Sequence, residues 1–252
     1  MIAWREKFRA VLLHFVVTLL MAAAAGALIF LAWYPDPFEA MLGGTRFFLL
    51  ITVCDLVLGP LTSLIIYNSK KTRRALIFDY TIVGIVQLAA FVYGVMSISN
   101  ARPAYIAFVK DRFEVVIAED LADKDLQAAE APYRTRPKWG PVLIGTRAPA
   151  TREERNDLVF AAMEGKDRQN FPQFYVPYEQ VADAVKQAAL PMAQLYKHRP
   201  EARQLIADEK LSVPEAQLRW LPIRGTRSFW TVLIDADSGR PLSYIPIDPY
   251  ES

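Results

Sequence analysis

The stretch VCDLVLGPLTSLIIYNSKK, residues 53–71, combines a hydrophobic run with features that are rare in a membrane-spanning helix. Asp55 places a carboxylate among apolar side chains, and Gly59 and Pro60 follow at once. A charged group inside a bilayer costs about 2.5–3.5 kcal/mol on insertion scales, so Asp55 is expected to face protein. Pro60 removes a backbone N–H and favours a kink. The stretch therefore indicates a helix that packs against other helices.

Two further runs of this kind surround the first one. A helix needs about 20 apolar residues to cross a bilayer. Three runs meet this requirement, and the predicted spans are 11–33, 47–67 and 75–98. The run over 11–33 is too long for a cleavable signal peptide and is interpreted as a retained anchor. The sequence therefore predicts a membrane domain over 1–102 and a separate domain over 103–252.

The distribution of charge predicts how these spans are oriented. Residues 1–102 carry 9 Lys and Arg against 5 Asp and Glu, whereas 103–252 carry 20 against 22. Basic residues gather before the first span and in the loop 70–74, while the loop 34–46 has two acids and one arginine. By the positive-inside rule, the N-terminus and the second loop are cytoplasmic. We therefore expect a multi-pass inner-membrane protein whose C-terminal domain lies in the periplasm.

Small and polar residues recur at helical spacing in the spans and predict a compact three-helix bundle with inward-facing stripes. The helical rise puts Asp55 and Gln87 at one depth, about 18 Å from the cytoplasmic end, and predicts a contact between them. Asp79 is expected to contact Thr62 or Ser63. The candidates for intramembrane packing or partner contact are Asp55, Gly59, Pro60, Thr62, Asp79 and Gln87. Packing within the bundle, a docking groove for another membrane helix and an ion path are the alternative interpretations.

The order of patterns in residues 103–252 predicts an α+β domain. Residues 104–118 are typical of two strands joined by a turn at Lys110–Asp111. Helical patterns follow, and one of them begins at a capping box formed by Thr151 and Glu154. The Pro-rich segment 127–145 is expected to be a long surface loop. Strand patterns end the chain, at 216–225, 228–236 and 241–247.

The sequence offers little material for catalysis. It contains no G-x-S-x-G, H-E-x-x-H, P-loop or G-x-G-x-x-G motif. Cys54 is the single cysteine, and His14 and His198 are the only histidines, so a disulfide is excluded and a metal site is not expected. The acidic balance of 103–252 argues against nucleic acid as a partner. We therefore expect no enzyme, no metal and no cofactor.

An aromatic-rich segment, 169–180, is the candidate contact surface of the outer domain. Some of its rings are expected in the core, and exposed ones would form a protein-binding patch. The candidate residues of this patch are Phe171, Phe174, Tyr175 and Tyr178.

Several segments resemble the TfpX/TfpZ family of type IV pilin accessory proteins. The resemblance covers roughly residues 30–121 and returns near the end of the chain. It is carried by FLAWYPDPF (30–38), CDLVLGPLTSLIIYNSKK (54–71), FDYTIVGIVQLAAFVYGV (78–95), ARPAYIAFVKDRFEVVIAEDL (101–121) and RGTRSFWTVLIDADSGRPL (224–242). The residues that match the family pattern within the spans are Asp55, Leu58, Gly59, Pro60, Asp79, Gln87 and Gly94.

The resemblance implies an inner-membrane accessory protein of Gram-negative bacteria. Such a protein would assist or modulate type IV pilus assembly through a chaperone-like interaction with the pilin, which has one hydrophobic helix and a periplasmic head. The family has no described catalytic residues. The alternative function is a membrane-tethered periplasmic ligand-binding or sensor protein. Since its cytoplasmic parts total only about 17 residues, a sensor would need a separate signalling partner.

Overall fold

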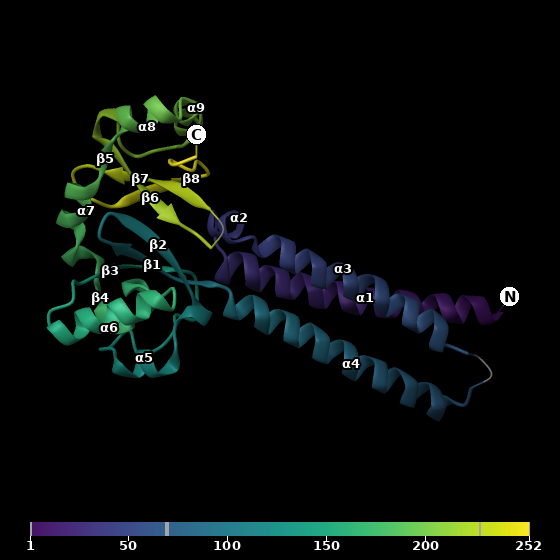
Figure 1. The fold of residues 1–252 in the computed structure, drawn as a ribbon. Coiled ribbons are helices and arrows are strands. Elements are labelled where there is room, and N and C mark those ends of the chain that lie inside the picture. The colour runs from purple at the N-terminus through teal and green to yellow at the C-terminus, as the bar shows by residue number, and fades with distance from the viewer. Residues whose placement is uncertain (1, 69–70, 227, 252) are drawn as a thin grey trace. The chain divides into compact units, whose positions relative to one another are not determined.

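The computed structural model describes residues 2–68, 71–226 and 228–251, and the chain divides into two compact units (Figure 1). Unit 1 comprises Met1–Pro35 and Gly43–Ala101. Unit 2 comprises Asp36–Leu42 and Arg102–Ser252. The two units therefore interleave in the sequence, whereas the predicted membrane domain took residues 1–102 as one stretch.

Unit 1 consists of three long apolar helices, α1 (Ile2–Leu28), α3 (Gly44–Ile66) and α4 (Arg73–Asn100). The π-helical turn η1 (Ile29–Trp33) extends α1. Each helix is long and apolar enough to cross a membrane, and the three segments that qualify are Trp4–Trp33, Gly44–Ile66 and Arg73–Asn100. Each segment begins earlier than its predicted span, because helical hydrogen bonding continues through polar residues outside the apolar run.

Two glycines let the helices of unit 1 approach closely. A Cβ on Gly59 of α3 would lie 2.9 Å from His14 Nε2 of α1. A Cβ on Gly94 of α4 would lie 2.7 Å from Ile51 Cδ1 of α3. Both distances are too short for a real Cβ, so these positions need glycine to keep the present packing. Small residues at helix crossings are the usual means of association between apolar helices.

Unit 2 is built on an eight-stranded mixed sheet with the order β4-β3-β1-β2-β6-β7-β8, and β5 pairs with β6. Neighbouring strands are antiparallel except for the parallel pairs β1–β3 and β2–β6. The predicted strands of residues 104–118 form the hairpin β1–β2, with Lys110 in the turn at φ 60°. The strands are β1 (Pro103–Val109), β2 (Arg112–Ile117), β3 (Val142–Thr146), β4 (Tyr175–Pro177), β5 (Leu190–Pro191), β6 (Leu218–Arg224), β7 (Phe229–Asp235) and β8 (Pro241–Ile245).

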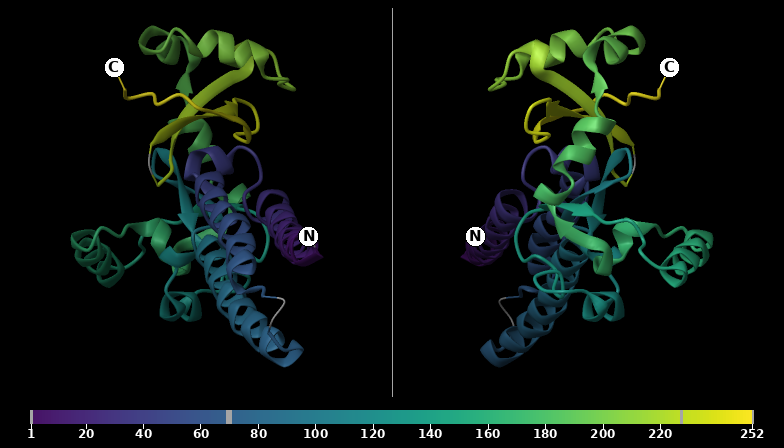
Figure 2. Two further views of the ribbon diagram at one scale, coloured as in Figure 1. Left: turned by 90° about the vertical axis from the view of Figure 1, so that its right-hand side faces the viewer. Right: turned by 90° about the vertical axis from the view of Figure 1, so that its left-hand side faces the viewer.

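Short helices flank the sheet at its two ends (Figures 1 and 2). α5 (Asp123–Ala128) and α6 (Arg152–Met163) lie near β1, β3 and β4, whereas α8 (Met192–His198) and α9 (Ala202–Asp208) lie near β5 and β7. The helix α7 (Ala182–Ala188) connects the two regions. Buried clusters of described residues follow this arrangement, with one around β1 and β3 and another joining α8 and α9 to β6 and β7.

The segment between the first two long helices forms α2 (Phe38–Leu42) and belongs to unit 2. Phe38, Met41 and Leu42 are buried. The Phe38 ring packs against Tyr244 of β8 with centroids 5.2 Å apart. Gly225 lies so close to Met41 that a Cβ on it would be 2.8 Å from Met41 Cγ. Sequence patterns did not predict this helix, because five residues are too few to show a helical period.

The predicted surface loop over 127–145 is wrong at its C-terminal end, where β3 begins at Val142. β3 pairs in parallel with β1, from Tyr105↔Val142 to Phe108↔Gly145. Parallel pairing is a non-local contact, so the local sequence carries little sign of it. The helix α6 is where the capping box predicted it, and the Thr151 hydroxyl accepts from the Glu154 N–H. No residue of α6 is fully buried, and its apolar residues Val159, Phe160 and Met163 are exposed.

Candidate functional site

A cavity of about 250 Å³ lies among the three long helices of unit 1. Asp55 of α3 contributes the only carboxylate in its lining, and His14, Thr18 and Gln87 add polar groups. Most of the remaining walls are apolar. The lining residues are His14, Val17, Thr18 and Met21 from α1, Asp55 from α3, and Gly84, Gln87, Leu88 and Phe91 from α4.

Asp55 faces this cavity without an internal partner. Its Oδ2 atom is buried and has no hydrogen bond to any described residue. Gln87 lines the same cavity, as the helical rise predicted, but no hydrogen bond joins the two side chains among the described residues. A buried carboxylate oxygen without a donor is costly in apolar surroundings. The cavity therefore holds an unsatisfied acceptor.

His14 and Ser63 form one of the polar contacts that join two of the helices. The His14 Nδ1 and Ser63 Oγ atoms are 2.6 Å apart, and Ser63 is fully buried. Gly59 lies one turn before Ser63, where its missing side chain leaves room for the His14 and Gln87 side chains. The buried face of α3 thus contains the small and polar residues of the predicted stripe, while Val57 and Leu58 are exposed.

The expected contact of Asp79 with Thr62 or Ser63 is wrong. The Asp79 carboxylate instead accepts a hydrogen bond from Lys71 Nζ at 2.6 Å. Thr62 donates to the Gly59 carbonyl within its own helix, and Ser63 pairs with His14. Helical depth alone suggested the contact. A lysine just before α4 reaches Asp79 more easily, because both lie near the start of that helix.

Pro60 lies within α3, which continues through it to Ile66. Contact of any of the six candidate residues with a partner helix stays a prediction.

The predicted aromatic patch of the outer domain is also wrong. Phe174, Tyr175 and Tyr178 are buried, and Phe171 is half-buried. Tyr175 belongs to β4, where it pairs with Thr146 of β3. The strand pairing turns these rings inward, and local composition could not reveal that pairing. The exposed apolar side chains in this region are Val159, Phe160 and Met163 of α6.

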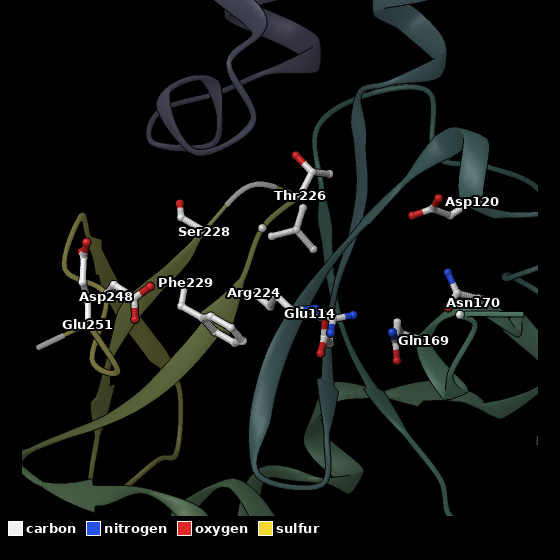
Figure 3. Close-up of a pocket in the computed structure, with 13 residues that line it drawn as sticks. Glu114, Asp120, Gln169, Asn170, Arg224, Thr226, Ser228, Phe229, Asp248 and Glu251 are labelled. Atoms are coloured by element: carbon white, nitrogen blue, oxygen red, sulfur yellow. The ribbon is translucent and has the colours of Figure 1, made fainter. Parts of the chain in front are cut away.

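Unit 2 contains a larger polar cleft of about 710 Å³ (Figure 3). At its centre the carboxylate of Glu114 in β2 forms ion pairs with two arginines. The Glu114 side chain is 3% exposed. Arg112 Nε lies 2.6 Å from Glu114 Oε1, and Arg224 Nε of β6 lies 2.8 Å from Glu114 Oε2. Asp248 and Glu251 line one end of the cleft, and Asp120, Gln169 and Asn170 line the other.

Sequence reasoning missed this cleft, although one signal was present. Glu114 is the only charged residue in the otherwise apolar run 113–117, and Arg112 directly precedes this run. A carboxylate at such a position must have a partner when it is buried. Arg112 is two positions away on the same strand, but Arg224 is 110 positions away, and its contact with Glu114 depends on the parallel pairing of β2 with β6.

Comparisons with known proteins place this chain among fimbrial proteins. The family model described as fimbrial assembly protein FimB matches residues 2–43. The serogroup I fimbrial assembly protein of Dichelobacter nodosus is 31% identical over 245 residues, which cover 95% of this chain and 94% of the relative. The serogroup E1 protein of the same organism is 30% identical with the same coverage. No solved structure matches. This chain therefore belongs to the family of fimbrial assembly proteins.

Proposed function

We propose that this protein assists type IV fimbrial assembly from the inner membrane by holding a fimbrial subunit in a chaperone-like way. Three apolar helices suited to a membrane and relatives named fimbrial assembly proteins support this role. With the N-terminus cytoplasmic, three crossings would carry unit 2 into the periplasm. The protein could then contact both the hydrophobic helix and the periplasmic head of a subunit.

The observation that carries the proposal is the unsatisfied Asp55 oxygen in the cavity of unit 1. α3 contacts both α1 and α4, and the cavity lies between residues of these two outer helices. Polar groups inside a bilayer are most often satisfied by another protein helix or by water, because lipid tails offer no donors. A subunit helix with a hydrogen-bond donor opposite Asp55 would both fill the apolar walls and satisfy this oxygen.

The segment between α1 and α3 is an alternative contact for the subunit helix, and we favour it less than the cavity of unit 1. Its apolar residues, Phe38, Met41 and Leu42, are already buried in unit 2. We therefore assign the subunit helix to the cavity of unit 1 rather than to this loop.

Co-purification of the fimbrial subunit with the tagged full-length protein tests the proposal. Asp55→Ala removes the acceptor, and we expect it to reduce the recovered subunit several-fold. Cys54→Ala is the matched control, because Cys54 is the exposed neighbour on the same helix. Equal recovery of the subunit with wild-type and Asp55→Ala protein would contradict the assignment of the cavity, and complete absence of the subunit from every sample would contradict the proposed role.

A further inference from the structure

Asp120, Gln169 and Asn170 line one end of the outer-domain cleft (Figure 3). Gln169 is 5% exposed, and its Oε1 atom has no hydrogen-bond partner among the described residues. A buried amide oxygen without a donor is unusual in folded proteins, since nearly all such atoms are paired. This atom therefore indicates that a donor from outside the chain belongs in the cleft.

Asp120 provides a second acceptor at the same end of the cleft. This carboxylate accepts from the Ile117 backbone N–H, but it forms no ion pair with a described residue. Burial raises the pKa of the Asp120 carboxyl, and Lys166 is the cation that most opposes this change. An exposed carboxylate without an ion pair and a buried amide oxygen without a donor together favour a group that carries positive charge and several N–H donors.

The balance of charge over the whole cleft points the same way. Four carboxylates line it, from Glu114, Asp120, Asp248 and Glu251, and the ion pair at its centre supplies the guanidinium groups of Arg112 and Arg224. Both arginines are paired with Glu114, and Arg199 lies 3.9 Å from the Glu251 carboxylate, so Asp120 at the other end is a lining carboxylate without an ion pair to a described residue. Within the described part of the chain, no three His, Cys, Asp or Glu side chains form a group suited to a metal ion.

The shape of the cleft favours a polypeptide over a small amine. Its volume of about 710 Å³ exceeds what a single cationic group fills. The pairing of β2 with β6 ends at Glu114↔Arg224, so β2 continues from Val115 to Ile117 without a partner strand on this side. Val115 lines the cleft, and an open strand edge is a common binding surface for an extended peptide.

We propose that the end of the cleft formed by Asp120, Gln169 and Asn170 binds the arginine or lysine side chain of an extended polypeptide partner. The cation lies between the Asp120 carboxylate and the Gln169 amide oxygen, and the peptide backbone runs along β2. This site is separate from the cavity of unit 1, and its occupant is defined by its positive side chain whether or not it is a fimbrial subunit.

Selection of a phage-displayed dodecapeptide library tests this assignment. The target is the full-length protein in lipid nanodiscs. We expect enrichment of arginine or lysine at one position of the selected peptides. Each selected peptide is then synthesised with a fluorophore, together with a neutral counterpart in which citrulline replaces arginine or acetyl-lysine replaces lysine, and binding is measured by fluorescence anisotropy. Selected peptides without a basic residue would overturn the proposal.

Variants of the chain locate the bound cation. A hydrogen bond to a charged group contributes enough that Asp120→Asn should weaken binding about tenfold or more. Gln169→Met should weaken it by a smaller factor, and because this change removes an amide without a partner for its oxygen, the fold should tolerate it. Asp208→Asn is the matched control, since Asp208 is an exposed carboxylate on α9, outside the cleft.

Three outcomes decide against the proposal. If both Asp120→Asn and Gln169→Met bind the peptide with wild-type affinity, the peptide binds elsewhere. This conclusion holds even if one of the two variants folds poorly. Equal affinity for the charged and the neutral peptides would show that the cation is not recognised. Displacement of the peptide by spermidine at a lower concentration than by unlabelled peptide would assign the cleft to a small polyamine instead.

Discussion

In unit 1 most apolar side chains face outward, whereas in unit 2 they face one another. In an apolar stretch of 18 residues within each spanning segment, the fraction of buried residues is 17% in the first, 11% in the second and 0% in the third. All seven residues of β1 in unit 2 are buried. Lipid tails accommodate outward apolar side chains, so a few small and polar contacts determine how membrane helices associate. Unit 2 depends instead on removing its own apolar surface from water.

The largest expected loss of stability is for a substitution of Phe113 in β2, within the core of unit 2. Its ring is fully buried and lies 5.5 Å from that of Phe108, so Phe113→Ala should lower the free energy of unfolding of unit 2 by about 3–5 kcal/mol. Leu58→Ala in α3 is the control, because Leu58 is 56% exposed, and its effect should stay within about 0.5 kcal/mol. Denaturant unfolding of the full-length protein in detergent measures both. Similar losses for the two variants would contradict the comparison.

The buried ion pair of unit 2 should show the next largest effect. Glu114→Ala leaves Arg112 and Arg224 without their common partner and should cost about 2 kcal/mol. This is less than for a fully buried pair, because the two arginine side chains are 28% and 45% exposed. Denaturant unfolding of the full-length protein measures this cost. A variant as stable as the wild type would show that the centre of the cleft does not depend on this ion pair.

The hydrogen bond between His14 and Ser63 in unit 1 should contribute less to the free energy of unfolding than Phe113 or Glu114 does in unit 2. Ser63→Ala removes the hydrogen bond to His14, and such bonds between membrane helices average about 0.6 kcal/mol. The double variant His14→Ala/Ser63→Ala measures the coupling energy in a thermodynamic cycle with the two single variants. A coupling energy above about 2 kcal/mol would mean that unit 1 depends on polar contacts as strongly as unit 2 depends on its core.

The smallest effect is expected at the surface of unit 2. Two hydrogen bonds from Arg147, with help from the Ala150 backbone N–H, lower the pKa of Glu154 from 4.5 to about 2. Because the pKa is lower in the folded state, the stabilisation is present above about pH 4.5 and is lost as the pH falls towards 2. Carboxyl NMR titration should show this pKa, and Arg147→Met should raise it towards 4.5. An unchanged pKa in that variant would contradict the assigned cause.

Periodicity predicted the longer local elements of this chain. The three long helices, the hairpin around Lys110 and the helix that begins after Thr151 follow from patterns within a few turns or strands. The same periodicity put Asp55, Gly59 and Ser63 on one helix face, and the structure places all three on the side of α3 that faces its neighbours. Features of this kind depend on residues that are close in sequence.

Most of the errors concern features that depend on distant residues. Tyr175 and Tyr178 were predicted as candidates for an exposed patch, and they are buried because β4 pairs with β3 across a long connection. The error at Asp79 is different, because its partner Lys71 is close in sequence and the prediction from helical depth did not include the reach of a lysine side chain. The cleft around Glu114 needs three separated segments to meet. No local pattern records such meetings, so only the fold reveals them.

Site-specific photocrosslinking in the native host tests the central claim, that the cavity beside Asp55 receives a fimbrial subunit helix. A photoreactive amino acid at Leu88 lies in the lining of the cavity. The same amino acid at Val86 is the control, because about 100° per residue places Val86 on the opposite, exposed face of α4. The account predicts a crosslink to the fimbrial subunit from Leu88 that is absent from Val86 and weakened by Asp55→Ala. Equal crosslinking from both positions, or none from Leu88 while subunits are present, would contradict it.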